Sequence, residues 1–247
     1  MSIIVSNIQR MCFDDGPGVR TTVFVKGCGI ACPWCANPES ISFGIEADKG
    51  LGKEYTPEEL VEEVLKDQMF WGIDGGVTFS GGEALMQAQE LEEVWRLLKE
   101  KGAHLAVETS LFVPRDSLVI ALRYIDFFYV DIKILEYNMC KQLLGGDAEL
   151  YKNNVVYLAS CNADIHFRIP CAKEHVLQEK NWNLICEFLQ NYREYPVEMF
   201  AIHDLGRKKY EKIDRKFVEF EKLTEEQLEK YAGQLRDQGC EVSIIRL

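Results

Sequence analysis

The sequence has no long hydrophobic run and no sign of a targeting segment. We find no stretch of about 18 apolar residues, the length that a membrane-spanning helix needs. The first six residues carry neither the basic region nor the apolar core that opens a secretory signal. Repeats, low-complexity tracts and Pro/Ser-rich linkers are absent as well. We therefore expect one cytoplasmic domain over residues 1–247, with no membrane as a partner.

Positive charge is scarce too. The chain has 28 lysines and arginines against 40 aspartates and glutamates, a formal net charge of −12. Nucleic acids and anionic membranes attract basic surfaces, so this balance argues against either as the main partner.

The nine cysteines are an odd number. In a chain without a secretion signal they are better interpreted as free thiols and metal ligands than as disulfides. Six of them share no ligand spacing, and we expect small apolar roles for them in the core or at the surface: Cys12, Cys140, Cys161, Cys171, Cys186 and Cys240.

Short apolar runs alternate with amphipathic stretches, a pattern typical of βα units around a parallel sheet. Strands rich in Val, Ile, Phe and Tyr are predicted at 19–27, 76–80, 104–109, 127–133, 164–169 and 197–202. Helices are predicted at 56–70, 84–101, 114–122, 147–160, 179–192 and 224–239, and a short strand at 240–246. The first helix has Thr56 as its N-cap and Pro57 behind it, and Gln227 is placed for a capping box in the last.

Six βα units in one domain predict a partial (β/α)6 TIM-like barrel, with residues 223–247 as a C-terminal cap. Its functional site should lie at the C-terminal ends of the strands. A doubly wound sheet is the competing architecture, because periodicity alone does not separate the two.

The first of these strands leads into a loop over residues 26–36 that contains three cysteines. Cys28, Cys32 and Cys35 have the spacing C-x3-C-x2-C, so their thiolates can converge on one small object. No fourth cysteine follows until Cys140. Three ligands on a four-iron cube leave one iron open for chemistry, whereas a structural site is closed. A zinc site completed by a distant Cys or His is the alternative.

The stretch from Asp15 to Cys28, which reads DGPGVRTTVFVKGC, resembles the radical S-adenosylmethionine superfamily when taken with the three cysteines. More narrowly, its DGPGxR lead-in and Asn37-Pro38-Glu39-Ser40 resemble the activating enzymes of glycyl radical enzymes. This resemblance extends over almost the whole chain. It implies one [4Fe–4S] cluster on the three cysteines and S-adenosylmethionine as the second cofactor. A large subgroup carries additional cysteine clusters between the NPES segment and the second strand. Residues 40–79 contain no cysteine, so we expect a single cluster and no ferredoxin-like insertion.

Polar residues at the ends of successive strands are where a barrel builds its site, although each alone is equally compatible with a solvated strand end. The resemblance assigns them to S-adenosylmethionine. Gly81, Gly82 and Glu83 would lie along its methionine part, and glycines there also suit a tight turn. Four side chains would bind mainly its carboxylate and ribose: Ser110, Asp131, Lys133 and Arg168.

Two further positions concern the adenosine. The resemblance places Trp34 beside the adenine, and loop packing is its alternative role. His203 opens the motif H-x-x-G-x-x-K-Y and would lie near the adenosine or the incoming substrate loop. The family pattern also allows a monovalent cation on Glu108 and Asp131, where many relatives carry aspartate at the first position. Many relatives have a Pro-Gly pair and an acidic residue soon after the arginine that corresponds to Arg168. Residues 169–175 of this chain depart from that pattern.

The resemblance implies reductive cleavage of S-adenosylmethionine to a 5′-deoxyadenosyl radical, which takes a hydrogen atom from a glycine Cα of a partner glycyl radical enzyme. A flavodoxin- or ferredoxin-type protein would donate the electron. Two alternatives remain open: a radical enzyme acting on a small molecule, like 7-carboxy-7-deazaguanine synthase, and a non-catalytic zinc or electron-carrier module.

Overall fold

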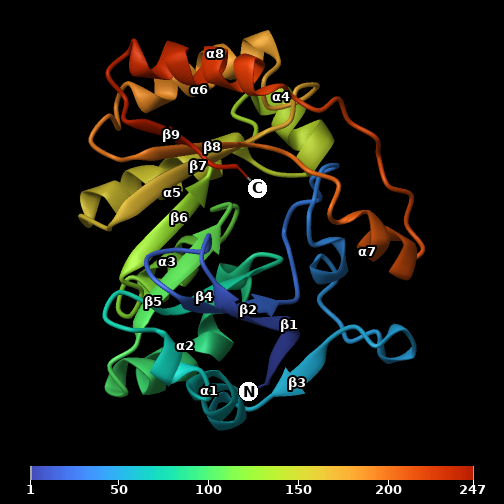
Figure 1. Ribbon diagram of the computed structural model, residues 1–247, viewed down its shortest axis with the longest axis vertical. Coiled ribbons are helices and arrows are strands. Elements are labelled where there is room, and N and C mark those ends of the chain that lie inside the picture. The colour runs from blue at the N-terminus through green and yellow to red at the C-terminus, as the bar shows by residue number, and fades with distance from the viewer. Residues whose placement is uncertain (1, 247) are drawn as a thin grey trace.

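The computed structural model describes residues 2–246 and contains one mixed sheet of nine strands (Figure 1). The strand order is β3-β1-β2-β4-β5-β6-β7-β8-β9. Neighbours from β2 to β9 run parallel, while β1 is antiparallel to β2 and to β3. The strands are β1 (Ile3–Cys12), β2 (Arg20–Val25), β3 (Lys53–Tyr55), β4 (Gly76–Gly81), β5 (His104–Thr109), β6 (Phe127–Asp131), β7 (Ile165–Cys171), β8 (Val197–Ala201) and β9 (Val242–Ile244).

The strand order decides between the two architectures that the sequence allows. From β2 to β9 each parallel strand lies beside the next one in the chain. A doubly wound sheet reverses its strand order at a switch point, whereas a barrel does not. The sheet therefore winds in one direction, and the predicted partial barrel is confirmed. It stays open, because β3 and β9 lie at opposite edges of the described sheet.

Helices cover the outer face of the curved sheet (Figure 1). The helices of the structure are α1 (Pro57–Leu65), α2 (Ala88–Glu100), α3 (Arg115–Ala121), α4 (Tyr137–Met139), α5 (Ala148–Ser160), α6 (Glu179–Leu189), α7 (Arg207–Lys212) and α8 (Glu225–Arg236), of which α7 lies apart from the others. The main hydrophobic core lies between these helices and the sheet, and a smaller cluster of Ala106, Phe127 and Tyr129 fills part of the barrel interior. No helix among the described residues has the length and apolar character needed to cross a membrane.

The predicted helix starts are confirmed by their caps. Thr56 and Thr224 both form capping boxes, with Glu59 and Gln227 as the respective partners. Residues 223–246 contain the helix and the strand expected for the C-terminal segment, α8 and β9, and β9 pairs parallel with β8. This segment extends the sheet by one more strand.

Several predicted boundaries are wrong. The helix expected over 56–70 ends at Leu65, and a 3-10 turn follows over Gln68–Phe70. Between them Asp67 accepts a hydrogen bond from Thr21 and forms an ion pair with Arg10. These tertiary contacts hold the backbone there in a conformation that does not continue the α-helix. The helix expected over 84–101 begins with a 3-10 turn, and that over 179–192 ends at Leu189.

Four elements escaped the sequence analysis. They are the strands β1 and β3, the helix α7, and α4 with the π-helical turn Cys140–Leu144 behind it. β1 contains two register irregularities and a polar stretch, so its alternation is interrupted. The other three are too short to show a period.

Candidate active site

A cavity of about 300 Å³ opens at the C-terminal ends of the parallel strands. Its wall combines residues from the loop after β2 with the ends of β4, β5, β6, β7 and β8, and also includes Asp14, Asp15 and Ile245 from the two sides of the sheet. Of the predicted site residues, Glu83 alone is not part of this wall. The others line it: Cys28, Cys32, Trp34, Cys35, Gly81, Gly82, Glu108, Ser110, Asp131, Lys133, Arg168 and His203.

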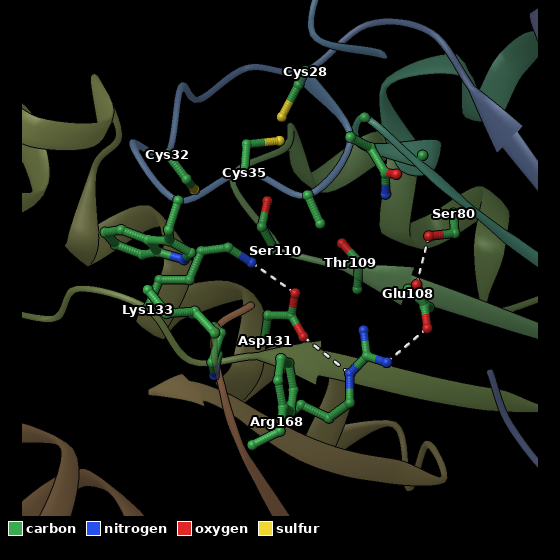
Figure 2. Close-up of a pocket in the computed structure, with 18 of the residues that line it drawn as sticks. Cys28, Cys32, Cys35, Ser80, Glu108, Thr109, Ser110, Asp131, Lys133 and Arg168 are labelled. Atoms are coloured by element: carbon green, nitrogen blue, oxygen red, sulfur yellow. Dashed lines mark hydrogen bonds and ion pairs between the residues drawn. The ribbon is translucent and has the colours of Figure 1, made fainter. Parts of the chain in front are cut away.

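The cysteine loop holds its three thiols along one side of this cavity (Figure 2). The backbone N–H of Cys28 donates to the carbonyl of Ile41 at 3.1 Å, and that of Cys35 donates to the carbonyl of Cys32 at 3.1 Å. None of the nine cysteines forms a disulfide. The thiols are therefore free to act as ligands.

The three thiols suit a group larger than one ion. Within residues 2–246, no three His, Cys, Asp or Glu side chains lie close enough together to hold a single metal ion. Burial raises the pKa of Cys28 to about 12, and burial also raises the pKa of Cys32 and of Cys35. Such thiols become ligands when a metal displaces their protons. The donor set of three sulfurs fits a four-iron cluster, which Cys28, Cys32 and Cys35 would hold while one iron stayed without a protein ligand.

Opposite the cysteines, four charged side chains form a continuous chain of ion pairs (Figure 2). The Lys133 ammonium lies 2.7 Å from Asp131, whose other oxygen accepts from Nε of Arg168 at 3.1 Å. The same guanidinium donates to Glu108 at 2.6 Å, and Ser80 donates to the second oxygen of Glu108 at 2.5 Å. Arg168 thus lies between the two carboxylates proposed for a monovalent cation.

These charges change each other's protonation. Burial pushes the pKa of Asp131 upward, but Lys133 and Arg168 outweigh it and hold that pKa below its usual range. At Glu108 burial prevails over Arg168 and raises the pKa. Burial pushes the pKa of Lys133 downward, but the nearby Asp131 carboxylate outweighs burial and raises this pKa overall, so the ammonium stays charged. A ligand carrying a carboxylate and an ammonium would find both complementary charges here.

The two glycines after β4 are required by the protein backbone itself. Gly81 has φ +109°, and a Cβ there would lie 2.4 Å from the carbonyl oxygen of Val25. A Cβ on Gly82 would lie 2.3 Å from the carbonyl oxygen of Gly27. Both glycines also line the cavity. Close packing of Gly81 against β2 and of Gly82 against the cysteine loop therefore accounts for both glycines without a cofactor, and their contact with one stays a prediction.

Glu83 lies behind the cavity wall with only 1% of its surface exposed. Its carboxylate accepts hydrogen bonds from the hydroxyl of Thr109 at 2.7 Å and from the backbone and hydroxyl of Ser110 at 2.7 and 2.6 Å. It thereby ties the end of β5 to the turn after β4. A direct contact between Glu83 and the cofactor stays a prediction, and the observed contacts make it a positioning residue for Ser110.

Trp34 packs within the protein and also lines the cavity, and its contact with the adenine stays a prediction. It lines the cavity with 8% of its surface exposed, and its ring stacks on His175 with centroids 5.3 Å apart and an interplanar angle of 25°. His175 belongs to the segment 169–175, where this chain departs from many relatives. No local pattern predicts this contact, because the two residues are far apart in the chain.

His203 lines the cavity, and burial lowers its pKa, so the ring is neutral at pH 7. Its Nδ1 accepts the backbone N–H of Leu205 at 3.3 Å, which leaves the proton on Nε2. The rest of the motif holds the cysteine loop. Lys209 donates to the carbonyl of Ala36 at 3.2 Å, and the Tyr210 hydroxyl donates to the carbonyl of Cys35 at 3.0 Å.

Two buried cations at the two ends of β2 hold the chain on either side of that strand, and the sequence analysis did not identify them. Arg20 is fully buried and donates to Thr78 at 2.5 Å and to the carbonyl of Pro17 at 2.8 Å. Lys26, also fully buried, donates to the carbonyl of Glu39 at 2.8 Å. Both residues are charged and lie within the strand predicted at 19–27. Because buried charges need partners, these charges could have predicted the contacts.

Fold and site together define an α/β-barrel enzyme with a cluster-binding cysteine loop above the strands. The family model of the radical SAM superfamily matches residues 22–179. The chain is 31% identical to the pyruvate formate-lyase-activating enzyme of Clostridium pasteurianum, over 94% of this chain and 97% of that protein. It is 28% identical to the trans-4-hydroxy-L-proline dehydratase activating enzyme of Clostridioides difficile, over 93% and 94%. Escherichia coli QueE shares the fold, with a TM-score of 0.63 at 13% identity over 100% and 95% of the two chains.

The chain therefore belongs to the radical SAM superfamily and, within it, to the family of activating enzymes. Its cofactors are a [4Fe–4S] cluster and S-adenosylmethionine, and both predictions are confirmed.

Proposed function

We propose that this chain activates a glycyl radical enzyme. When bound, the cluster supplies the electron that cleaves S-adenosylmethionine into methionine and a 5′-deoxyadenosyl radical, which takes a hydrogen atom from a glycine Cα of the partner. One observation supports this above all: three free thiols and a chain of opposite charges face each other across one cavity. The relatives are named as activating enzymes of other proteins.

Each part of the wall has a distinct task in this proposal. Cys28, Cys32 and Cys35 hold the cluster. Lys133 and Arg168 attract the carboxylate of S-adenosylmethionine, while Asp131 accepts from its ammonium or ribose hydroxyls. The adenine side is formed by Trp34 and His203, with Gly81, Gly82 and Ser110 along the methionine.

The substrate in this proposal is a peptide loop, and the open sheet supports that choice. Asp14 and Asp15, between β1 and β2, and Ile245, after β9, come from opposite sides of the sheet and line the same cavity. A closed barrel has no lateral edge where an extended chain can enter. A glycine also suits the task, because its Cα carries no side chain to block approach.

The test uses reconstituted protein under anaerobic conditions with a reductant, S-adenosylmethionine and a panel of glycyl radical enzymes. The panel includes the kinds named for the relatives: pyruvate formate-lyase, hydroxyproline dehydratase and hydroxyphenylacetate decarboxylase. We expect a glycyl electron paramagnetic resonance signal with one partner, formed together with 5′-deoxyadenosine. Cys35→Ala should abolish both products, whereas the exposed Cys161→Ala should retain them.

Two other results would point elsewhere. Formation of 5′-deoxyadenosine without a glycyl signal from any partner would contradict the activase proposal and favour a small-molecule substrate. Zinc in place of iron would favour the non-catalytic alternative. A flavodoxin- or ferredoxin-type electron donor is part of the same proposal, and the cytoplasmic location stays a prediction.

A further inference from the structure

A basic surface lies directly over the cysteine loop in an otherwise acidic protein. Residues 207–216 contain six basic and two acidic side chains, a net charge of +4. The chain as a whole has −12, so the other 237 residues carry −16. This segment consists of α7 and the four residues that follow it. Its net charge therefore has the opposite sign to that of the rest of the chain. We call it the α7 patch.

Four cations of the α7 patch are exposed and have no role in the fold. In the described part of the chain, no carboxylate lies within ion-pair distance of Lys208, Lys212, Arg215 or Lys216, and all four are exposed. The two remaining cations are engaged, since Arg207 pairs with Glu219 and Lys209 with Glu39. Lys208 and Lys212 lie one helical turn apart on the same face.

The α7 patch is separated from a cluster ligand by a single side chain. Tyr210 reaches from α7 to the carbonyl of Cys35 at 3.0 Å, and a Cβ on Gly206 would lie 3.0 Å from the carbonyl of Ala36. The Arg215 N–H donates to the carbonyl of Tyr210 at 3.0 Å, which brings the end of the patch back to the helix. Figure 1 shows α7 at the outside of the molecule, away from the helices that cover the sheet.

We propose that the α7 patch is the docking surface for an acidic one-electron donor protein of the flavodoxin or ferredoxin kind. This inference rests on the proposed function, which requires one electron from outside for each cleavage. The donor loses one electron and the cluster gains it, and no bond is formed or broken in that step. An acidic donor is repelled by most of this surface and attracted by the patch, so charge complementarity selects the face nearest Cys35.

The composition of the patch suits a transient complex. Electron-transfer interfaces are small, and electrostatic steering raises their association rate by 10- to 1,000-fold while exposed charges are unscreened. Leu205, 75% exposed directly before α7, supplies an apolar contact beside the charges. Such a surface binds briefly and releases the oxidised donor.

The test compares two variants with the same change in net charge. The patch variant replaces Lys208, Lys212, Arg215 and Lys216 by Gln, and the control variant replaces the exposed Lys66, Lys101, Lys180 and Lys230 by Gln. A flavodoxin is the probe. Its Kd is measured by flavin fluorescence with cluster-free and cluster-loaded protein, and its hydroquinone is used to follow cluster reduction by stopped-flow absorbance.

We expect the patch variant to weaken flavodoxin binding and to slow reduction at least tenfold at low salt. The control variant should stay within about threefold of the wild type. The wild-type rate should fall steeply with salt, and the patch variant should be nearly insensitive to it. Equal rates or equal Kd values for the two variants would overturn the proposal.

A second measurement separates the donor from the substrate protein. With photoreduced deazaflavin in place of flavodoxin, the patch variant should form the glycyl radical at the wild-type rate. Loss of glycyl radical formation under this chemical reduction, with flavodoxin binding intact, would show that the patch binds the substrate protein and would overturn the proposal. If no variant and no wild-type protein forms a glycyl radical, the proposed function fails instead, and the Kd values still decide the docking site.

Discussion

At the scale of single residues, Asp131 is the centre of the cavity. Among the described residues it is the one carboxylate that pairs with both Lys133 and Arg168, and its side chain is 18% exposed. A carboxylate between two cations is ionised at a lower pH than usual, as its lowered pKa indicates. Removal of that charge leaves two cations close together with Glu108 as the remaining counter-charge.

We predict that Asp131→Asn lowers the free energy of unfolding of the cluster-free protein by about 2 kcal/mol at pH 7. An unfolded aspartate has a pKa near 3.9. The folded pKa lies below it, so this stabilisation is complete above about pH 4 and is lost as the pH falls through the folded pKa. The difference between wild type and variant should therefore be constant from pH 8 to 5 and shrink below about pH 4.

Thermal unfolding between pH 8 and pH 3 measures this difference. Asp164→Asn is the matched control, because Asp164 is 63% exposed and faces only His166 at 3.9 Å. We expect it to change stability by less than about 0.5 kcal/mol. A difference for Asp131→Asn that grows toward acid would contradict the argument.

The sequence predicted the members of the site better than their contacts. Three cysteines within eight residues after a strand, and polar residues at successive strand ends, are local patterns. Which of those strand ends meet is a matter of register: Asp131 faces Arg168 because β6 pairs with β7 at that position. The stacking of His175 on Trp34 depends on a long loop after β7 and leaves no periodic signal.

At the scale of elements, α7 acts as a clamp on the cysteine loop. It has only six residues, yet it supplies Lys209 and Tyr210, which donate to the backbone on both sides of Cys35. The sequence indicated the motif by resemblance, but a six-residue helix shows too little periodicity to be predicted. The helix can hold the loop because it contacts residues that lie more than 170 positions earlier in the sequence.

Tyr210→Phe should therefore loosen the cluster without unfolding the protein. The hydroxyl donates at 3.0 Å to the carbonyl of Cys35, and the side chain is 6% exposed, so the lost hydrogen bond leaves a carbonyl without its donor. A hydrogen bond of this kind contributes about 1 kcal/mol, or roughly fivefold in an equilibrium constant. We expect iron to be lost to a chelator about five times faster than from the wild type.

Anaerobic iron release followed by absorbance measures the effect, and Tyr137→Phe is the control. Tyr137 is 51% exposed, and among the described residues its hydroxyl forms no hydrogen bond. Equal release rates for Tyr210→Phe and the wild type would show that α7 does not hold the loop.

The same scale shows why β1 and β3 were missed while the parallel strands were found. A parallel strand under helices is buried on both faces and is a continuous apolar run, as in β4. β1 is half-exposed, with a polar stretch from Ser6 to Arg10 and irregular register on its partner. Half-exposed strands of this kind are stabilised by neighbouring strands that the local sequence does not reveal.

At the scale of the whole molecule, the cluster and S-adenosylmethionine bind between parts of the chain that are far apart in the sequence. The cysteine loop follows β2 near one edge, while Arg168 and His203 come from β7 and the end of β8 toward the other. A ligand that contacts both sides binds the folded chain alone. Its binding free energy must therefore add to the stability of the fold.

For this reason we predict that S-adenosylmethionine raises the unfolding temperature of the cluster-loaded protein. At a concentration of about 100 times Kd the gain is about 2.7 kcal/mol, which for a chain of this size corresponds to roughly 5–10 °C. Cys28→Ala should lose most of this shift, because the ligand's contact with the open iron is missing, and Cys161→Ala should keep it. Anaerobic differential scanning calorimetry measures this shift. An undiminished shift in Cys28→Ala would mean that S-adenosylmethionine binds independently of the three-cysteine loop. The assignment of that loop as the anchor of the ligand would then be wrong.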